Sequence, residues 1–452
     1  MFAANILCSI DNRLGKCHGI EIRELTINQA HEHFKSGSLT PEKLTECYLN
    51  RIKEMNPFLN AVIEFNPDAL KIAKTLPEEL KTRPLYGIPI LVKDSIATKD
   101  KMNTTAGNPS LLSARPKDDA EVVKRLRRAG AIILGKANLS EMSGARGGQT
   151  KNPYDISGPV KGSSSGSAVA VSANLAMVAL GTETSGSLNS PAMMNSIFAL
   201  KPTYDLVSNE GVVPVASSMD TVGGMTRSAD DLKIITDVLT GSQASYVEKK
   251  KLKVGLLNYS NGTSDLEFDK FKSLLEKSAT VIPSDELSLK DLDYITDAYL
   301  KTAVAELSPS LDSYIKNTEN TNITLKYLID QKEGSPAASY DFLKLILSSS
   351  SSNNTIDIQM GQTLARKAID DLLEKNKVDV LLVFEDPDSN AIFYSAMARY
   401  PSMTIPLGLD DKGFPKSIFA CTRANSDSDL LSVALAANGK AIFRHKPKFI
   451  GY

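Results

Sequence analysis

The hydroxyl side chains of this sequence gather in two short Gly- and Ser-rich clusters in the middle of the chain, residues 161–167 and 181–187. Glycine and serine at the junctions of secondary-structure elements permit unusual backbone angles and let a ligand approach backbone N–H groups closely. This composition fits three interpretations: a phosphate-binding loop, close packing of a helix on a sheet, or nucleophilic catalysis by a serine.

A phosphate-binding loop requires a spacing that neither cluster has. A P-loop needs G-x-x-x-x-G-K-[ST], and no Gly-Lys-Ser/Thr follows the glycines here. The dinucleotide fingerprint G-x-G-x-x-G is also missing from this segment. Close packing accounts for the apolar stretch at 168–173 but not for the gathering of hydroxyls in two loops. Packing and catalysis therefore both remain open on composition alone.

A catalytic serine needs a base within reach, and backbone N–H groups can stabilise the oxyanion that forms. The four histidines all lie near the chain ends, at 18, 31, 33 and 445. A Ser-His-Asp arrangement would have to recruit one of them, and we expect them instead to be solvated or to cap helices.

A lysine that burial drives toward its neutral form can replace histidine as the base. Lys93 is the candidate, because it follows the apolar run 87–92 and would lie at the exit of a buried strand. A structural ion pair between Lys93 and Asp94 is the alternative role for this side chain.

Strand-like and helix-like segments alternate along the chain, which predicts an α/β architecture with a largely buried sheet. Apolar runs predict strands at 87–93, 131–134, 177–180, 252–257, 378–384, 403–407 and 417–420. Helical spacing predicts helices at 20–56, 119–129, 168–173, 361–375 and 428–437. Asn56-Pro57 is expected to end the first helix. The stretch 258–355 is polar and weakly periodic, and its serine run, 348–352, predicts a surface loop.

The composition is that of an ordinary globular protein with an ample core: 452 residues, 42% hydrophobic and 23% charged. The formal net charge of −1 lacks the basic excess that is typical of nucleic-acid-binding proteins, so we expect no nucleic-acid partner. No apolar run approaches the length of a membrane span, and the first ten residues lack the features of a signal peptide, so we expect a cytoplasmic protein. The four cysteines form no C-x-x-C pair and are expected to be reduced; a Cys8–Cys17 disulfide is the alternative.

Several ordered motifs together resemble the amidase signature family. They are Gly87-Ile-Pro-Ile-Leu-Val-Lys-Asp94, Lys161-Gly-Ser-Ser-Ser-Gly-Ser167, Gly181-Thr-Glu-Thr-Ser-Gly-Ser187, Leu200-Lys-Pro-Thr203 and Ser218-Met-Asp-Thr-Val-Gly223. The similarity covers most of 40–440 and is closest to the peptide-amidase branch. It implies a single large α/β/α layered domain with a central mixed sheet and N-terminal helices. We divide the chain into an N-terminal helical segment, 1–80, and a catalytic domain, 81–452, with a substrate-shaping region at about 240–380.

The resemblance implies an amide hydrolase with a Ser-Ser-Lys triad. Ser187 would be the acylated nucleophile, and Ser163, following a cis peptide bond, would relay its proton to a neutral Lys93. The backbone N–H groups of Thr184, Ser185, Gly186 and Ser187 would form the oxyanion hole. The chemistry needs no metal or organic cofactor. The expected partner is a small-molecule or peptide amide, and a homodimer is compatible with the family.

Four departures from the family pattern bear on the mechanism and the substrate. Lys161 replaces a glycine and adds a cation that could alter the titration of Lys93, while Ser185 stands where glycine or aspartate is usual. Asn189 replaces an arginine that grips a substrate carboxylate in glutamine-hydrolysing amidotransferases, which disfavours that alternative function. The segment between Glu141 and Gly147 is shorter than in peptide amidases, which affects the acyl pocket. A catalytically impaired scaffold or binding relative is the non-enzymatic alternative, disfavoured by the intact triad.

Overall fold

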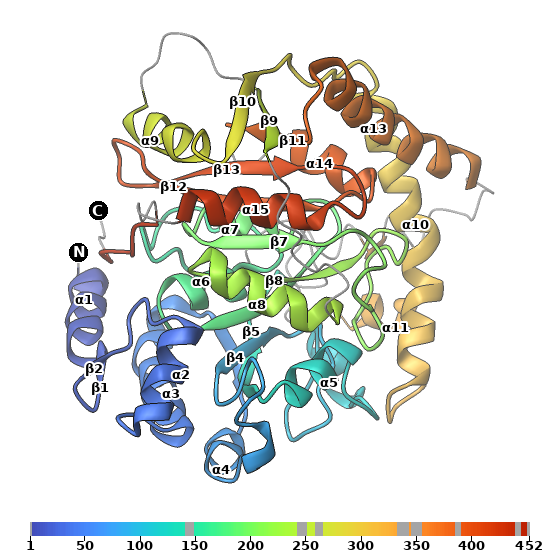
Figure 1. The fold of residues 1–452 in the computed structure, drawn as a ribbon. Coiled ribbons are helices and arrows are strands. Elements are labelled where there is room, and N and C mark those ends of the chain that lie inside the picture. The colour runs from blue at the N-terminus through green and yellow to red at the C-terminus, as the bar shows by residue number, and fades with distance from the viewer. Residues whose placement is uncertain are drawn as a thin grey trace.

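A computed structural model describes residues 2–140, 149–241, 251–257, 265–331, 343–344, 355–384, 390–438 and 444–449. Within these residues, eleven strands form one mixed sheet in the order β10-β9-β11-β13-β12-β7-β8-β6-β4-β5-β3 (Figure 1). The strands are β3 Val62–Phe65, β4 Pro89–Lys93, β5 Ile132–Ala137, β6 Val178–Glu183, β7 Phe198–Lys201, β8 Thr221–Thr226, β9 Leu252–Leu257, β10 Ala279–Pro283, β11 Val380–Val383, β12 Ser402–Leu409 and β13 Pro415–Cys421.

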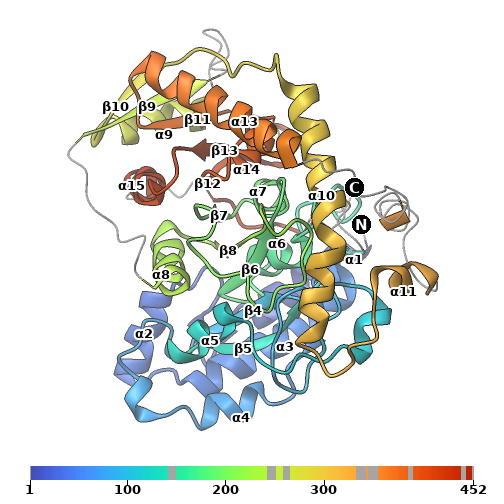
Figure 2. The ribbon, with the colours of Figure 1, turned by 90° about the vertical axis from the view of Figure 1, so that its right-hand side faces the viewer.

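Helices cover both faces of this sheet. They are α1 Phe2–Leu14, α2 Ile27–Ser36, α3 Pro41–Leu59, α4 Ala69–Lys74, α5 Glu121–Arg128, α6 Ser165–Ser172, α7 Asn189–Met193, α8 Ala229–Thr240, α9 Leu266–Leu275, α10 Leu292–Lys316, α11 Leu325–Asp330, α13 Thr355–Asn376, α14 Asn390–Met397 and α15 Asp427–Asn438. In Figure 2, α8 and α15 lie on one side of the central strands, and α6, α7 and α10 lie on the other. The predicted α/β/α layering around a mixed sheet is confirmed.

The central strands are apolar because helices bury them on both faces. Every residue of β4, β5, β6 and β8 is buried. Parallel pairing joins β4 to both β5 and β6, whereas β8 runs antiparallel to β6. The end of β4 and the end of β6 therefore lie side by side, which places Lys93 beside the second Gly- and Ser-rich cluster.

The predicted helix at 20–56 is two helices with a later end. Gly37, in the left-handed conformation at φ 71°, closes α2. Thr40 then caps α3 by accepting from the N–H of Lys43, as its position before a proline predicts. The end predicted at Asn56-Pro57 is wrong, because Asn60 at φ 49° closes the helix after Leu59. The side-chain oxygen of Asn56 accepts from the backbone N–H groups of Ala61 and Val62, which fixes the C-terminal end of α3.

Residues 258–355 contain more regular structure than their weak periodicity predicts. They form α9, β10, the 25-residue α10, and α11. The pattern of α10 is irregular because the helix packs against several partners, including α11, α13 and α14. The predicted serine loop at 348–352 lies outside the described residues.

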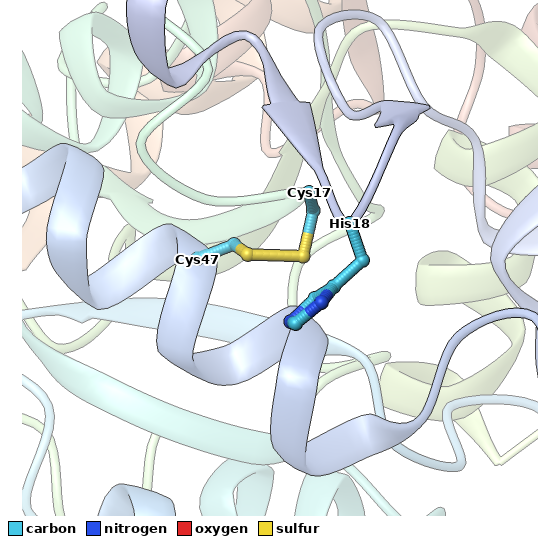
Figure 3. Close-up of side chains that lie close together, drawn as sticks. All are labelled: Cys17, His18 and Cys47. Atoms are coloured by element: carbon cyan, nitrogen blue, oxygen red, sulfur yellow. A yellow bond between two sulfur atoms is a disulfide. The ribbon is translucent and has the colours of Figure 1, made fainter.

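A disulfide joins the hairpin near the N-terminus to α3 (Figure 3). The hairpin consists of β1 Lys16–Cys17 and β2 Ile20–Glu21, and Cys17 is bonded to Cys47 of α3. The expectation of four reduced thiols is therefore wrong for this pair, and the alternative Cys8–Cys17 pairing does not form. Spacing alone could not identify the pair, since α3 brings Cys47 to the hairpin across 30 residues. None of the described helices combines the length and apolarity needed to cross a bilayer.

Candidate active site

The Lys93 amine lies between two hydroxyl groups in the interior of the protein. Its Nζ is 2.6 Å from Ser163 Oγ and 2.7 Å from Thr182 Oγ1. Lys93 and Ser163 are both fully buried. β4 and β6 position Lys93 and Thr182, and the loop before α6 positions Ser163. The structure thus brings two of the three predicted catalytic residues into direct contact.

Burial drives Lys93 toward its neutral form. Desolvation lowers the pKa of the amine to about 7, and the carboxylates of Asp220 and Glu183 oppose this shift. The alternative ion pair with Asp94 does not form. Asp94 instead accepts hydrogen bonds from the Thr105 hydroxyl and the Gly107 backbone. An amine with this pKa exchanges its proton near neutral pH, as a general base must.

The first Gly- and Ser-rich cluster divides its serines between packing and chemistry. Ser164 Oγ donates to the Thr182 carbonyl and accepts from the Thr182 N–H, and Ser167 Oγ donates to the Leu180 carbonyl. These serines hold α6 against β6. Gly166 allows close approach, because an added Cβ would lie 2.4 Å from the backbone oxygens of Ala61 and Asn138. The packing interpretation is therefore right for these residues.

Ser163 differs from its neighbours in that cluster. The peptide bond between Gly162 and Ser163 is cis, as the resemblance implies. The Ser163 side chain lies against Lys93, whereas its carbonyl accepts from the Ser140 N–H at 3.1 Å. Lys161, one residue before this bond, adopts a left-handed conformation at φ 54°.

The second cluster carries Ser187 to the same region. The Ser187 carbonyl accepts from the Ser164 N–H at 3.0 Å, so the two clusters lie side by side. Ser187 is partly exposed although Lys93 and Ser163 are buried. Gly186 has φ +122°, a backbone conformation that residues with a Cβ rarely adopt. Ser187 thus presents a partly exposed hydroxyl on a loop whose backbone binds the residue after Ser163.

Glu183 and Asn189 bracket the loop that bears Ser187. The Glu183 carboxylate accepts from the backbone N–H groups of Leu188 and Asn189. Asn189 is fully buried, and its side chain also binds Ser402 and Thr404 of β12. The residue that replaces the family's arginine thus faces the sheet.

The opposite side of the loop is fixed by Asp220. Its carboxylate accepts from Thr184 Oγ1 at 2.6 Å and from the backbone N–H groups of Val215 and Ala216. Burial raises the pKa of Asp220 to about 6. The hydrogen bonds from Thr184 and the two backbone groups oppose that rise.

Thr182 and Asp220 contact site residues although the sequence predicts no role for either. Thr182 sits inside the quoted motif around Ser187, and its contact with Lys93 follows from the parallel pairing of β4 and β6. Asp220 sits inside the Ser218-Met-Asp motif, and β8 returns it to the loop through antiparallel pairing with β6. In both cases a motif marked the residue, and only the sheet register shows its partner.

A cavity of about 730 Å³ lies on the Asp220 side of the loop. Its lining includes Asp220, Asn209, Glu306 and Tyr314. The cavity walls do not include Lys93, Ser163 or Ser187. The segment 141–147, which bears on the predicted acyl pocket, lies outside the described residues.

The histidines take no part in this arrangement. His18 and His445 are exposed, and His33 Nδ1 lies 2.9 Å from Ser38 Oγ near the end of α2. His31 Nε2 contacts the Tyr86 carbonyl, and partial burial lowers the pKa of this imidazole. Solvated or local roles describe all four side chains.

Among the described residues, one cluster has the ligand types for a metal ion. Cys17, His18 and Cys47 place three potential ligand atoms within 4.8 Å of one another (Figure 3). The two sulfur atoms are joined in the disulfide, and a coordinating thiolate requires a free sulfur.

Comparison with known proteins places this geometry in a family. The Amidase family model matches residues 43–384. An Arabidopsis thaliana protein named "probable amidase" is 34% identical, with 95% of this chain and 92% of that protein aligned. The A subunit of the glutamyl-tRNA(Gln) amidotransferase of Thermoanaerobacter pseudethanolicus is 30% identical, with 96% and 99% aligned.

Solved structures agree with the sequence comparisons. Peptide amidase from Stenotrophomonas maltophilia superposes with a TM-score of 0.81 at 31% identity, over 94% of this chain and 99% of that one. An amidase family protein from Bacillus anthracis has a TM-score of 0.82 at 28% identity, over 98% of both chains. The protein described here therefore belongs to the amidase family and is a hydrolase of carbon–nitrogen amide bonds.

Proposed function

We propose that this amidase acts through a Ser187–Ser163–Lys93 relay and an acyl-enzyme. The observation that carries the proposal is the contact of 2.6 Å between Lys93 Nζ and Ser163 Oγ in a fully buried pair. Together with a lysine pKa of about 7, this contact provides a base that is mostly neutral above pH 7. The partly exposed Ser187 is the group that a substrate can reach.

The proton moves in a closed cycle. As Ser187 Oγ attacks the amide carbonyl carbon, its proton passes to Ser163 Oγ while Ser163 gives its own proton to Lys93. The tetrahedral oxyanion is stabilised by backbone N–H groups among Thr184, Ser185, Gly186 and Ser187. The relay then returns the proton to the leaving nitrogen, and the C–N bond breaks. Water hydrolyses the ester by the reverse path and regenerates neutral Lys93.

The proposed substrates are carboxamides, including the C-terminal amide of a peptide. The similarity to peptide amidase over nearly the full length of both chains supports this class. Ammonia is the product when the amide nitrogen is unsubstituted, and an amine is the product otherwise.

Glutamine hydrolysis within an amidotransferase is the second candidate, supported by the 30% identity to a glutamyl-tRNA(Gln) amidotransferase polypeptide. The position of Asn189 argues against it. Its side chain is held by Glu183, Ser402 and Thr404, and it carries no positive charge to hold the carboxylate of free glutamine.

Ammonia release from a panel of substrates tests the proposal. The panel contains glutamine, a small aliphatic amide, an aromatic amide and a C-terminal peptide amide, each with wild-type enzyme and Ser187→Ala. We expect turnover of the peptide or aromatic amide that Ser187→Ala abolishes, and covalent labelling by a fluorophosphonate that the same variant loses. Chymostatin, the competitive inhibitor bound in a peptide amidase structure, should inhibit this turnover. Exclusive turnover of glutamine would support the second candidate, and a folded wild type that neither labels nor hydrolyses any amide would refute the proposal.

A further inference from the structure

Ser185, the unusual residue of the nucleophile loop, has a partner far away in the sequence. Its Oγ donates to the hydroxyl of Tyr299 at 3.1 Å, across 114 residues. Tyr299 lies on α10, in the region predicted to shape the substrate pocket. Where glycine or aspartate is usual in the family, this chain has a serine whose hydroxyl joins the loop to α10.

Tyr299 is itself held by α14. Its ring meets the ring of Phe393 edge to face, with centroids 5.6 Å apart and an interplanar angle of 87°. On the same helix, the side chain of Ile392 approaches to 3.4 Å of the position that a Cβ on Gly186 would occupy. The loop therefore contacts α10 at Ser185 and packs against α14 at Gly186.

The two rings keep part of their surface accessible. Tyr299 and Phe393 are only partly buried, whereas the adjacent Ile392 and Tyr394 are buried. Burial raises the pKa of Tyr299, so the side chain is a neutral phenol whose oxygen accepts the hydrogen bond from Ser185. An aromatic surface of this kind, beside the loop that bears the nucleophile, suits an apolar or aromatic group of a substrate.

We propose that Tyr299 is a positioning residue for the oxyanion loop and that Tyr299 and Phe393 form an aromatic wall that selects amides with an aromatic or large apolar group. The inference rests on the proposed function and names the substrate class of the same site. Oxyanion donors act through their preorganised geometry, so a tether on Ser185 affects the transition state more than the bound substrate. The wall affects substrate binding, so the two roles separate in kcat and KM.

The tether is tested by a double-mutant cycle of Tyr299→Phe and Ser185→Ala. Each single variant removes one partner of the same hydrogen bond, and we expect each to lower kcat about fivefold to tenfold with KM nearly unchanged. The double variant should be no slower than either single one. Tyr294→Phe is the matched control, because Tyr294 is an exposed tyrosine of the same helix whose hydroxyl binds Asp357. Its kcat should match the wild type.

The wall is tested with Phe393→Ala and a pair of substrates, an aromatic amide and a small aliphatic amide. We expect the kcat/KM for the aromatic amide, divided by that for the small aliphatic amide, to fall about tenfold. Most of this change should come from a higher KM for the aromatic amide. Multiplicative effects of the two tether variants, or an unchanged substrate ratio in Phe393→Ala, would overturn the inference. Failure of the proposed function is distinguishable from failure of this inference, because the proposed function is tested by the loss of turnover and labelling in Ser187→Ala.

Discussion

The carboxylate of Glu183 accepts hydrogen bonds from both the backbone N–H and the side-chain amide of Asn189, at 2.8 and 2.9 Å. A third bond, from the Leu188 N–H at 2.7 Å, reaches the same group. The four residues between Glu183 and Leu188 are those assigned to the nucleophile and the oxyanion hole. One buried carboxylate thus closes the loop, because it binds the backbone immediately after Ser187.

Replacing this carboxylate should loosen the loop at nearly constant volume. Glu183→Gln removes the charge and exchanges one acceptor oxygen for a donor that faces N–H groups. We expect unfolding free energy to fall by about 2 kcal/mol, because hydrogen bonds to a charged group are lost. The kcat/KM for amides should fall by about 100-fold, as when one oxyanion donor is removed. Urea unfolding and turnover measure the two effects; Glu267→Gln, on a partly exposed surface pair with Lys270, is the control. Unchanged turnover in Glu183→Gln would show that the Glu183 carboxylate does not position the loop that bears Ser187.

Lys93 should be essential in a way that another buried lysine is not. Lys93→Met removes the base, and we expect turnover to fall by about 10³-fold, within the usual range for losing general-base catalysis. Lys136→Met is the matched control, because Lys136 is also fully buried with its pKa lowered by burial to about 8, yet binds Ile96 and Thr104. The folded fraction of that variant should retain turnover. Equal losses in both variants, after correction for folded protein, would contradict the role of Lys93.

The pH dependence should follow the neutral form of Lys93. The fraction of enzyme molecules with neutral Lys93 rises with pH, because the pKa of Lys93 is about 7. The kcat/KM should therefore rise by up to tenfold per pH unit below pH 7 and level off above it. Asp220, with a pKa of about 6, also loses its proton as the pH rises, and its carboxylate holds Thr184 of the loop. The slope of log kcat/KM against pH should therefore steepen below pH 6. Initial rates from pH 5 to 9, with circular dichroism to confirm folding, measure this profile. Rates that decline between pH 6 and 8 would exclude a neutral lysine as the base.

Two adjacent serines should respond in opposite ways. Ser163→Ala interrupts the relay, and we expect turnover to fall by at least about 100-fold with little change in stability. Ser164→Ala removes two hydrogen bonds to the Thr182 backbone, and we expect unfolding free energy to fall by about 1–3 kcal/mol with turnover changed less than tenfold. Turnover and thermal unfolding of both variants distinguish relay from packing. A Ser163→Ala enzyme as active as Ser164→Ala would remove Ser163 from the mechanism.

The local part of the site is readable in the sequence, and the long-range part is not. Apolar β4 marks Lys93, and the Gly- and Ser-rich clusters mark Ser163 and Ser187, because each signal lies within a few residues. The contact between Ser185 and Tyr299 depends on how α10 crosses the molecule, and no periodicity encodes that crossing. Asp220 carries no local sign of its partner Thr184, since antiparallel pairing of β6 and β8 brings the two together.

The fold shows the same division. Buried strands such as β6 and β11 are predictable because continuous apolar runs, 177–180 and 380–383, suit strands covered on both faces. The helix α10 was missed because its buried positions serve several neighbours and so follow no single stripe. The Cys17–Cys47 pair and the end of α3 were mispredicted, since both depend on contacts made after the elements pack.

The strand order has a consequence for protein synthesis. β7 lies between β8 and β12, and its pairing with β12 begins at Ser402, about 200 residues after β7 leaves the ribosome. During that interval the half-built sheet presents an open edge, which is prone to pairing with other nascent chains. The side chain of Asn189 gains its partners Ser402 and Thr404 only when β12 arrives. Translation thus sets a delay before the nucleophile loop can take its final form, and ribosome-bound fragments that stop short of β12 should need chaperones and remain unreactive toward a fluorophosphonate.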